Sequence, residues 1–257
     1  HNFSIEPTTN TFSFYIVYMC HHIKPASVGV YLSGICHSLE PYFPNVHSIH
    51  SSAIVTHSLA GMKKLHGLQA TSRKHALNRE DLIHIISHLP SVLSHECLLF
   101  VAMLLTGFYG LLCLGELTFP DSTHKRSSKK LTLRHTLILE ATHFSFILPF
   151  HKADQFYAGN TVMIEALPHS PIDPLFHLQH YLDSGDRSFP FFPALWLTSQ
   201  GKLPTYSWFV GQLQSFLGTD IAGHSLRSGG TTALALAGVP DNAIQATGCW
   251  SSDTWHI

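Results

Sequence analysis

The chain has 257 residues, of which 45% are apolar and 12% charged, and its formal net charge is −1 at pH 7 with histidine neutral. This composition is typical of a globular protein and excludes a disordered one. The length suffices for one large domain or two ordinary ones. The five cysteines are scattered and form no Cys-x-x-Cys pair, which argues against a disulfide framework or a zinc ribbon. We therefore expect a reducing intracellular compartment.

The basic residues are distributed unevenly along the chain. Ten of the fifteen Lys and Arg residues lie in residues 63–79 and 125–134, which contain no acidic residue. A net charge near zero disfavours a nucleic-acid partner, but such stretches suit contact with phosphates if the fold places them on one face. The alternative is two solvated faces balanced by acids elsewhere. The candidate DNA-binding residues are Lys63, Lys64, Arg73, Lys74, Arg79, Lys125, Arg126, Lys129 and Lys130.

The first part of the chain has the pattern of a small helical domain. Apolar residues recur at helical spacing from residue 10 to about residue 70, with Pro, Gly or Asn between the segments. Asn78 is placed to cap a new helix that begins near Arg79, since acidic residues follow in its first turn. The sequence therefore predicts one domain over residues 1–75 and a second over residues 76–257.

The apolar run of residues 97–114, CLLFVAMLLTGFYGLLCL, is about long enough to span a bilayer. It carries Thr106 and two glycines, and no Lys or Arg lies close to either end to set an orientation. A buried core helix running to about Glu116 is favoured over a membrane span. The start of the chain lacks a basic region and a methionine, so we expect no signal peptide and a fragment of a longer protein.

A change of period follows the apolar run. Residues 131–150 alternate apolar and polar side chains and are rich in Thr, Ile and Phe, which predicts two or three strands. Residues 151–160 have the composition of a turn, and residues 161–167 resume as a strand. Beyond Pro174 the spacing is helical again. The predicted fold is mainly α with a small antiparallel β-sheet, its helices lying around the sheet.

The segment GHSLRSGG, residues 223–230, contains the clearest candidate site. His224 and Arg227 are three residues apart and therefore share one face of a helix. An imidazole and a guanidinium on one face can converge on a single anionic group.

Four segments follow one another along the chain: CLGEL at the end of the apolar run, FHKAD at the strand turn, HSLR, and GCWSSD. This order resembles the catalytic domain of the tyrosine recombinase (phage integrase) superfamily, and residues 10–75 resemble its helical core-binding domain. Segments such as YLSGICHSLEPYFP and HSLRSGG look closest to integrase-like proteins of fungal mobile elements. The resemblance implies DNA recombination in the nucleus through a 3′-phosphotyrosyl intermediate, without metal or cofactor, by copies that assemble on double-stranded DNA.

The resemblance also implies roles for particular residues. Arg227 matches the second arginine and His224 the histidine of the group that holds the scissile phosphate. Lys152 matches the strand-turn lysine that assists the leaving oxygen, and Trp250 the late His/Trp position. Guanidinium groups suit this task because they bind phosphate oxygens bidentately and stabilise developing charge. Alternatively, Lys152 is a solvated turn residue, Trp250 a core residue, His224 a structural histidine and Arg227 a surface charge.

The chain departs from the family at two required positions. Cys113 stands where the family has its first arginine, and a neutral thiol cannot clamp a phosphate. The nucleophilic tyrosine would lie just past Ile257. The chain has 21 His but six Arg, and Cys249, Gln155 and His256 also stand where the family tends to carry arginine. Because single transitions convert CG-type arginine codons to Cys, His or Gln, we hypothesise a decayed, catalytically inactive mobile-element copy. The alternative is a non-catalytic DNA-binding protein that kept the fold.

Two further segments have the pattern of a binding site. Residues 231–250 read as a helix, a turn and a helix, which could be a sequence reader, although Asn242 and Gln245 are the few side chains suited to base edges. Cys20, His21 and His22 are adjacent residues with no second pair at zinc spacing, so we interpret them as structural and expect no metal site.

Overall fold

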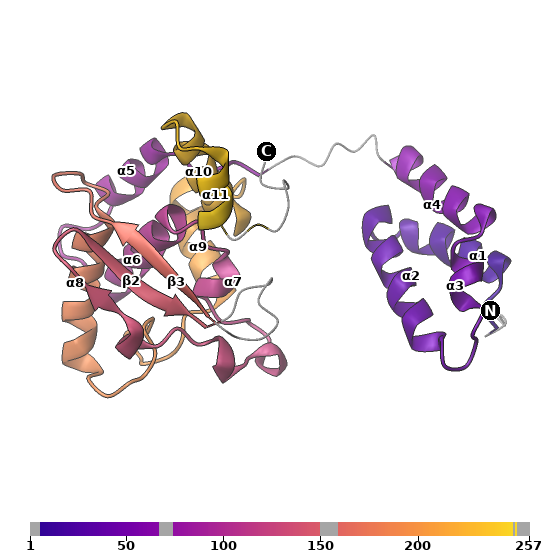
Figure 1. The fold of residues 1–257 in the computed structure, drawn as a ribbon, viewed down its shortest axis with the longest axis horizontal. Helices are drawn as coiled ribbons and strands as arrows, with labels where there is room; N and C mark the ends of the chain where they lie inside the picture. The colour runs from indigo at the N-terminus through magenta and orange to yellow at the C-terminus, as the bar shows by residue number, and fades with distance from the viewer. Residues whose placement is uncertain (1–5, 67–73, 150–158, 249, 251–257) are drawn as a thin grey trace. The chain divides into compact units, whose positions relative to one another are not determined.

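The computed structural model describes residues 6–66, 74–149, 159–248 and 250 (Figure 1). The chain divides into two compact units, His1–Arg73 and Lys74–Ile257. Each unit has its own hydrophobic core.

The first unit is helical, as the apolar spacing predicts. Its helices are α1 (Thr9–Cys20), α2 (Pro25–Leu39), α3 (Val46–His50) and α4 (Ala53–His66). The buried side chains of α1 and α2 recur every four residues and meet those of α3 and α4 in one cluster, because residues four apart share a helix face. The cluster consists of Phe12, Ile16, Cys20, Val28, Leu32, Cys36, Val46, Val55 and Met62.

The three residues weighed as a metal site do not converge. Cys20 is buried in this core, whereas His21 and His22 are exposed. Burial raises the pKa of the Cys20 thiol, which suits an inert packing residue. Within the described residues, no three His, Cys, Asp or Glu side chains are placed to hold a metal ion.

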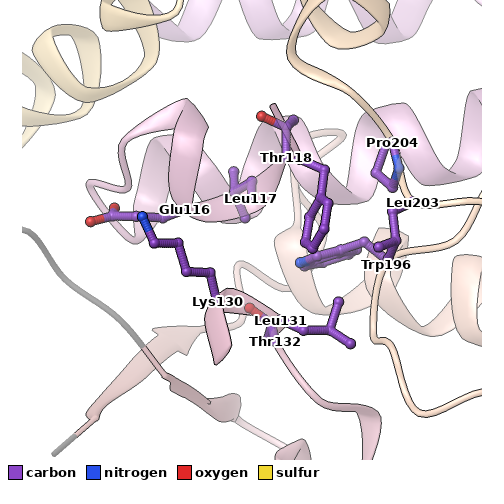
Figure 2. A pocket seen from close by; sticks show the side chains of 10 residues that line it. Glu116, Leu117, Thr118, Lys130, Leu131, Thr132, Trp196, Leu203 and Pro204 are labelled. Carbon is purple, nitrogen blue, oxygen red and sulfur yellow. The ribbon is translucent and has the colours of Figure 1, made fainter. Parts of the chain in front are cut away.

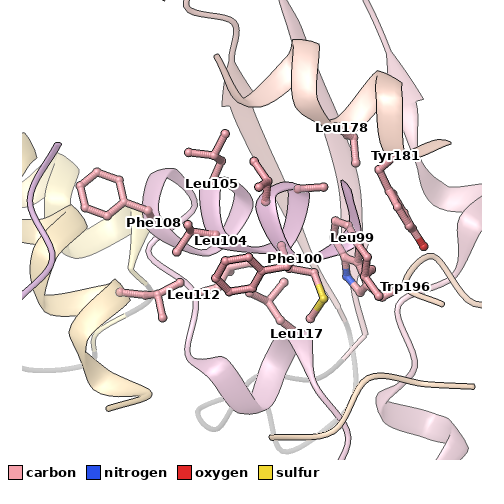
Figure 3. Close-up of a cluster of buried hydrophobic side chains, with 14 of the residues drawn as sticks. Leu99, Phe100, Leu104, Leu105, Phe108, Leu112, Leu117, Leu178, Tyr181 and Trp196 are labelled. Carbon is pink, nitrogen blue, oxygen red and sulfur yellow. The ribbon is translucent and has the colours of Figure 1, made fainter. Parts of the chain in front are cut away.

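The second unit is built on a buried helix. Its helices are α5 (Arg79–Ser87), α6 (His95–Tyr109), α7 (Leu114–Leu117), α8 (Pro174–Ser188), α9 (Tyr206–Leu217), α10 (His224–Leu236) and α11 (Asp241–Thr247). Residues 99–108 of α6 are all buried, and α6 packs against α8 and α10. Figure 3 shows α6 side chains such as Phe100 and Leu104 surrounded by those of neighbouring elements. No helix in the described ranges is long and apolar enough to span a membrane.

The apolar run ends earlier than predicted. We expected helix to about Glu116, but α6 ends at Tyr109. Leu111 then adopts a left-handed conformation (φ 51°), and the N–H of Leu112 bonds back to the carbonyl of Gly107 at 2.9 Å. The chain is redirected there, so that Cys113 lies outside α6 and directly before the short helix α7.

The sheet has three antiparallel strands in the order β1 (Ile138–Leu139), β2 (His143–Leu148) and β3 (Asn160–Glu165). Phe144 and Phe146 of β2 point into the core, and the register pairs Phe144 with Ile164. The predicted turn at residues 151–160 lies almost wholly outside the described residues.

The alternation over residues 131–150 predicted two or three strands, and two of them, β1 and β2, lie in that range, whereas residues 131–136 belong to neither. They pair locally with residues 193–195 instead: Leu195 donates its N–H to Thr132 at 2.9 Å, and Arg134 donates to Pro193 at 2.8 Å. A 3₁₀ turn, Arg134–Thr136, follows. These bonds form one isolated antiparallel bridge between Leu133 and Ala194. The bridge does not extend into a strand pair because the following turn carries the chain away from residues 193–195.

Candidate phosphate-binding site

The site is organised around Arg227, which lies one turn into α10. Its Nη1 donates to the Sγ of Cys113 at 2.9 Å, and its Nη2 donates to the backbone carbonyl of Gly248. Its Cζ lies 4.0 Å from the centroid of the Trp250 ring, within the range of a cation–π contact. Three positions that the sequence singled out from distant segments are thereby brought together. His224 is the first residue of the same helix and is exposed.

Glycines allow α10 to approach its neighbours closely. A methyl group at Gly229 would overlap the backbone carbonyl of Leu77, and one at Gly230 would overlap that of Phe108. Gly230 therefore sets how deeply α10 sits against α6, and Gly229 sets its approach to the segment before α5. That depth in turn places the Arg227 guanidinium beside Cys113.

Cys113 and Glu116 form the other wall of the site. The backbone N–H of Cys113 donates to Oε2 of Glu116 at 2.7 Å, which caps α7. Burial raises the pKa of the Glu116 carboxyl, while the Cys113 N–H and the Arg227 guanidinium act in the opposite direction. A carboxylate here balances part of the guanidinium charge.

Two cavities flank Arg227. One, of about 160 Å³, is lined by Cys113, Leu114, Gly115, Tyr206, Gly223, His224 and Arg227. The other, of about 330 Å³, is lined in part by Glu116, Arg227 and Gly248 and by Leu148 and Asn160, which end β2 and begin β3. Lys152 itself lies outside the described residues. The strand ends on either side of its segment nevertheless border a cavity of the site.

The second basic stretch contributes one residue near α7. Figure 2 shows the Lys130 side chain extending toward Glu116 along a small pocket that also contains Thr118 and Trp196. Lys125 and Lys129 lie in the 3₁₀ turns before it and are exposed. The guanidinium of Arg126 is partly engaged, since its Nε donates to the carbonyl of Pro120 at 2.9 Å.

The first basic stretch is divided between the two units. Lys63 and Lys64 lie in the last turn of α4, and Arg73 lies outside the described residues. Lys74 donates to the carbonyl of Thr219 at 2.9 Å. Burial raises the pKa of the Tyr109 hydroxyl, and the guanidinium of Arg79 beside it acts in the opposite direction. Lys74 and Arg79 are thus partly committed to contacts within the protein.

Tyr206 lines the smaller cavity although nothing in the sequence pointed to it. It is the first residue of α9 and lies far from Cys113 in the sequence. In the folded chain its ring lies next to Gly223. Its neighbours in the sequence carry no motif, so only the position of the start of α9 beside Gly223 could reveal it. Residues 231–250, weighed as a sequence reader, contain the second half of α10, a turn and α11.

No protein-family model matches the chain, and no curated protein matches it in sequence. Solved structures do share its fold. The chain is similar to a λ integrase (residues 75–356) dimer bound to a core site, with a TM-score of 0.57, 15% identity and coverage of 98% of this chain and 80% of that one. It is also similar to the Tn1549 transposon integrase with circular intermediate DNA (0.55, 15%, 96% and 78%). For the XerH recombinase bound to its palindromic substrate, the TM-score is 0.55 and the identity 14%, with coverage of 95% of this chain and 64% of that one.

The chain therefore shares the fold of these integrase and recombinase structures and is mainly helical with a small antiparallel sheet. The predicted fold class is confirmed.

Proposed function

We propose that this chain is a double-stranded DNA-binding protein of tyrosine recombinase type that serves DNA recombination and integration. The observation that carries the proposal is the 2.9 Å contact between Arg227 Nη1 and Cys113 Sγ. The position assigned to the first arginine of the family thus lies beside the second, as required of two groups that clamp one phosphate.

The same contact supports the loss of strand-transfer chemistry in this copy. Two guanidinium forks stabilise the charge that develops on a phosphate in the transition state. Here one fork is replaced by a thiol, which is short and a weak hydrogen-bonding group. The thiol and the Gly248 carbonyl occupy two of the five Arg227 N–H donors, leaving three for a ligand.

The sequence patterns support further proposals on the domains, the related mobile elements, the compartment and the assembly. In this proposal residues 1–75 form a core-binding domain and residues 76–257 a catalytic-type domain of a mobile element related to fungal integrase-like proteins. The protein acts in the nucleus and assembles as several copies on DNA. The λ integrase dimer and tetramer on DNA illustrate such assembly for that protein.

The second candidate is a non-catalytic DNA-binding protein, and the exposed basic residues favour it. Lys125 and Lys129 are exposed, and contact with DNA through them does not depend on the catalytic groups around Arg227. Phosphate contacts of this kind supply affinity without sequence information.

The test of DNA binding is a titration of a labelled generic duplex with the whole chain across a salt series. We expect affinity to fall steeply as salt rises. Arg227→Gln should make the slope of log K against log salt shallower by about 0.9, the value for one lost phosphate contact. Arg187→Gln is the matched control, since Arg187 lies at the end of α8 and donates to the carbonyl of Asp183 within its own helix. Absence of binding at low salt would refute the proposal.

A nicking assay on the same duplex tests the loss of chemistry that both candidates share. The chain as printed is expected to give neither a nick nor a covalent protein–DNA species. A covalent species would show that the chemistry survives and would contradict the assigned role of Cys113.

A further inference from the structure

Tyr206 is held in a fixed position at the edge of the smaller cavity. Thr205 caps α9 by accepting the N–H of Trp208, and the N–H of Tyr206 bonds to the carbonyl of Phe119 at 3.0 Å. The beginning of α9 is thereby tied to the strand-like segment that follows α7. These bonds set the backbone position of Tyr206, from which its ring extends.

The Tyr206 ring lies directly against Gly223, the residue before His224. A methyl group built on Gly223 would come within 2.7 Å of the Tyr206 hydroxyl oxygen and 2.9 Å of its Cε2. Glycine at this position therefore lets the hydroxyl approach the first turn of α10. His224 and Arg227 project from that turn.

Two of the polar side chains that line this cavity make no hydrogen bond to any described residue. Among the described residues, neither the Tyr206 hydroxyl nor the His224 ring makes a hydrogen bond, and three Arg227 N–H groups remain unassigned. No carboxylate is among the lining residues. A cavity with one permanent cation, one imidazole, one hydroxyl and no acid is suited to an anion.

We infer that the Tyr206 hydroxyl donates a hydrogen bond to the DNA phosphate held by Arg227 and His224. The inference rests on the proposed function and adds to it a phosphate-binding residue that no motif assigns. Tyr206 would act here as a neutral donor that binds the phosphate, without forming a covalent bond to it.

The first experiment is duplex binding by Tyr206→Phe across the same salt series. Phenylalanine keeps the ring on Gly223 and removes only the hydroxyl, so thermal unfolding should be unchanged. We expect affinity to fall about ten-fold, the usual range for a hydrogen bond to a charged group. The salt slope should stay the same because no cation is lost. Tyr42→Phe is the control, since Tyr42 is 78% exposed and lies in the first unit.

A double variant tests whether the two residues share one phosphate. In the Arg227→Gln background, Tyr206→Phe should cause little further loss, because groups that bind one ligand are coupled. Unchanged affinity in the single variant, or fully additive losses in the double variant, overturns the inference.

A second measurement keeps the inference testable if the chain does not bind DNA. With 3-fluorotyrosine at position 206, inorganic phosphate should shift the fluorine resonance, and the shift should vanish in Arg227→Gln. A fluorine label at Tyr42 should not respond. A response to phosphate without DNA binding would support the Tyr206 assignment and refute the DNA function. No response to phosphate and no effect of Tyr206→Phe would refute the assignment alone if DNA still binds.

Discussion

Arg227 Nη1 donates a hydrogen bond to Cys113 Sγ over 2.9 Å, joining the start of α7 to the first turn of α10. Glu116 stands behind this pair, since its carboxylate accepts the N–H of Cys113. The carboxylate partly compensates the positive charge of Arg227, so a second guanidinium at position 113 would meet less repulsion.

Cys113→Arg should strengthen DNA binding. A second guanidinium beside Arg227 can bind the same phosphate, and Glu116 reduces the repulsion between the two cations. We expect higher affinity and a salt slope steeper by about 0.9, the value for one added phosphate contact. Ser215→Arg adds the same charge on an exposed turn of α9 and should not reproduce the gain if the phosphate binds between residues 113 and 227. Equal gains in both variants would show that only net charge matters.

Cys113→Arg combined with a C-terminal extension that supplies the family's tyrosine should recover DNA nicking. The arginine restores charge stabilisation and the tyrosine restores the nucleophile. The measurement is covalent protein–DNA complex on a labelled duplex, with each single change as its control. A folded double revertant that remains inactive counts against the decay hypothesis.

Gly230→Ala should strongly destabilise the second unit. The added methyl group would overlap the carbonyl of Phe108, so α10 must move away from α6, at a cost of about 3 kcal/mol. Gly211→Ala is the control, because Gly211 is exposed in α9 and a methyl there meets nothing within 4 Å. That change should stabilise the protein by about 0.5–1 kcal/mol. Urea unfolding compares the two, and similar unfolding midpoints would contradict the close packing.

His177 should make stability depend on pH. Burial lowers the pKa of its imidazole below the ordinary 6.5, and its Nε2 lies 2.9 Å from the carbonyl of Pro171. The unfolded chain therefore binds this proton first as the pH falls. The contribution is fully present above the unfolded pKa and is lost as the pH falls through it toward the folded pKa.

His177→Gln keeps a donor toward Pro171 without a titrating group. Between about pH 7.5 and 5.5 the variant should lose less unfolding free energy than the parent chain, as measured by urea denaturation. The exposed His124, which does not act on His177, provides the control as His124→Gln. Identical pH profiles for the parent and His177→Gln would eliminate this contribution.

Asn78→Ala should cost about 1 kcal/mol, the usual value of a helix N-cap. The Asn78 side chain accepts the N–H of Asp81 at 2.8 Å, and Asp81 accepts the N–H of Asn78 at 2.9 Å. Asn78→Ser retains an acceptor and should be close to neutral. Thermal unfolding that treats the two substitutions alike would show that the cap contributes nothing.

The sequence by itself determined the local features of this protein. Apolar spacing gave the helices of the first unit, and the acidic residues after Asn78 gave the capped start of α5. The three-residue spacing placed His224 and Arg227 on one turn of a helix. These features are predictable because they depend on residues only a few positions apart, whose geometry is set by the backbone.

Only the tertiary structure decided which groups surround Arg227. The end of α6 at Tyr109 and the left-handed Leu111 set the position of Cys113, and the packing of α9 brought Tyr206 to the cavity. The structure also pairs Arg134 with Asp186 at 2.7 Å. A count of basic residues does not reveal that this arginine is engaged by an acid within the protein. Such contacts join segments far apart in the chain, and they depend on side-chain volumes and helix approach, which periodicity does not encode.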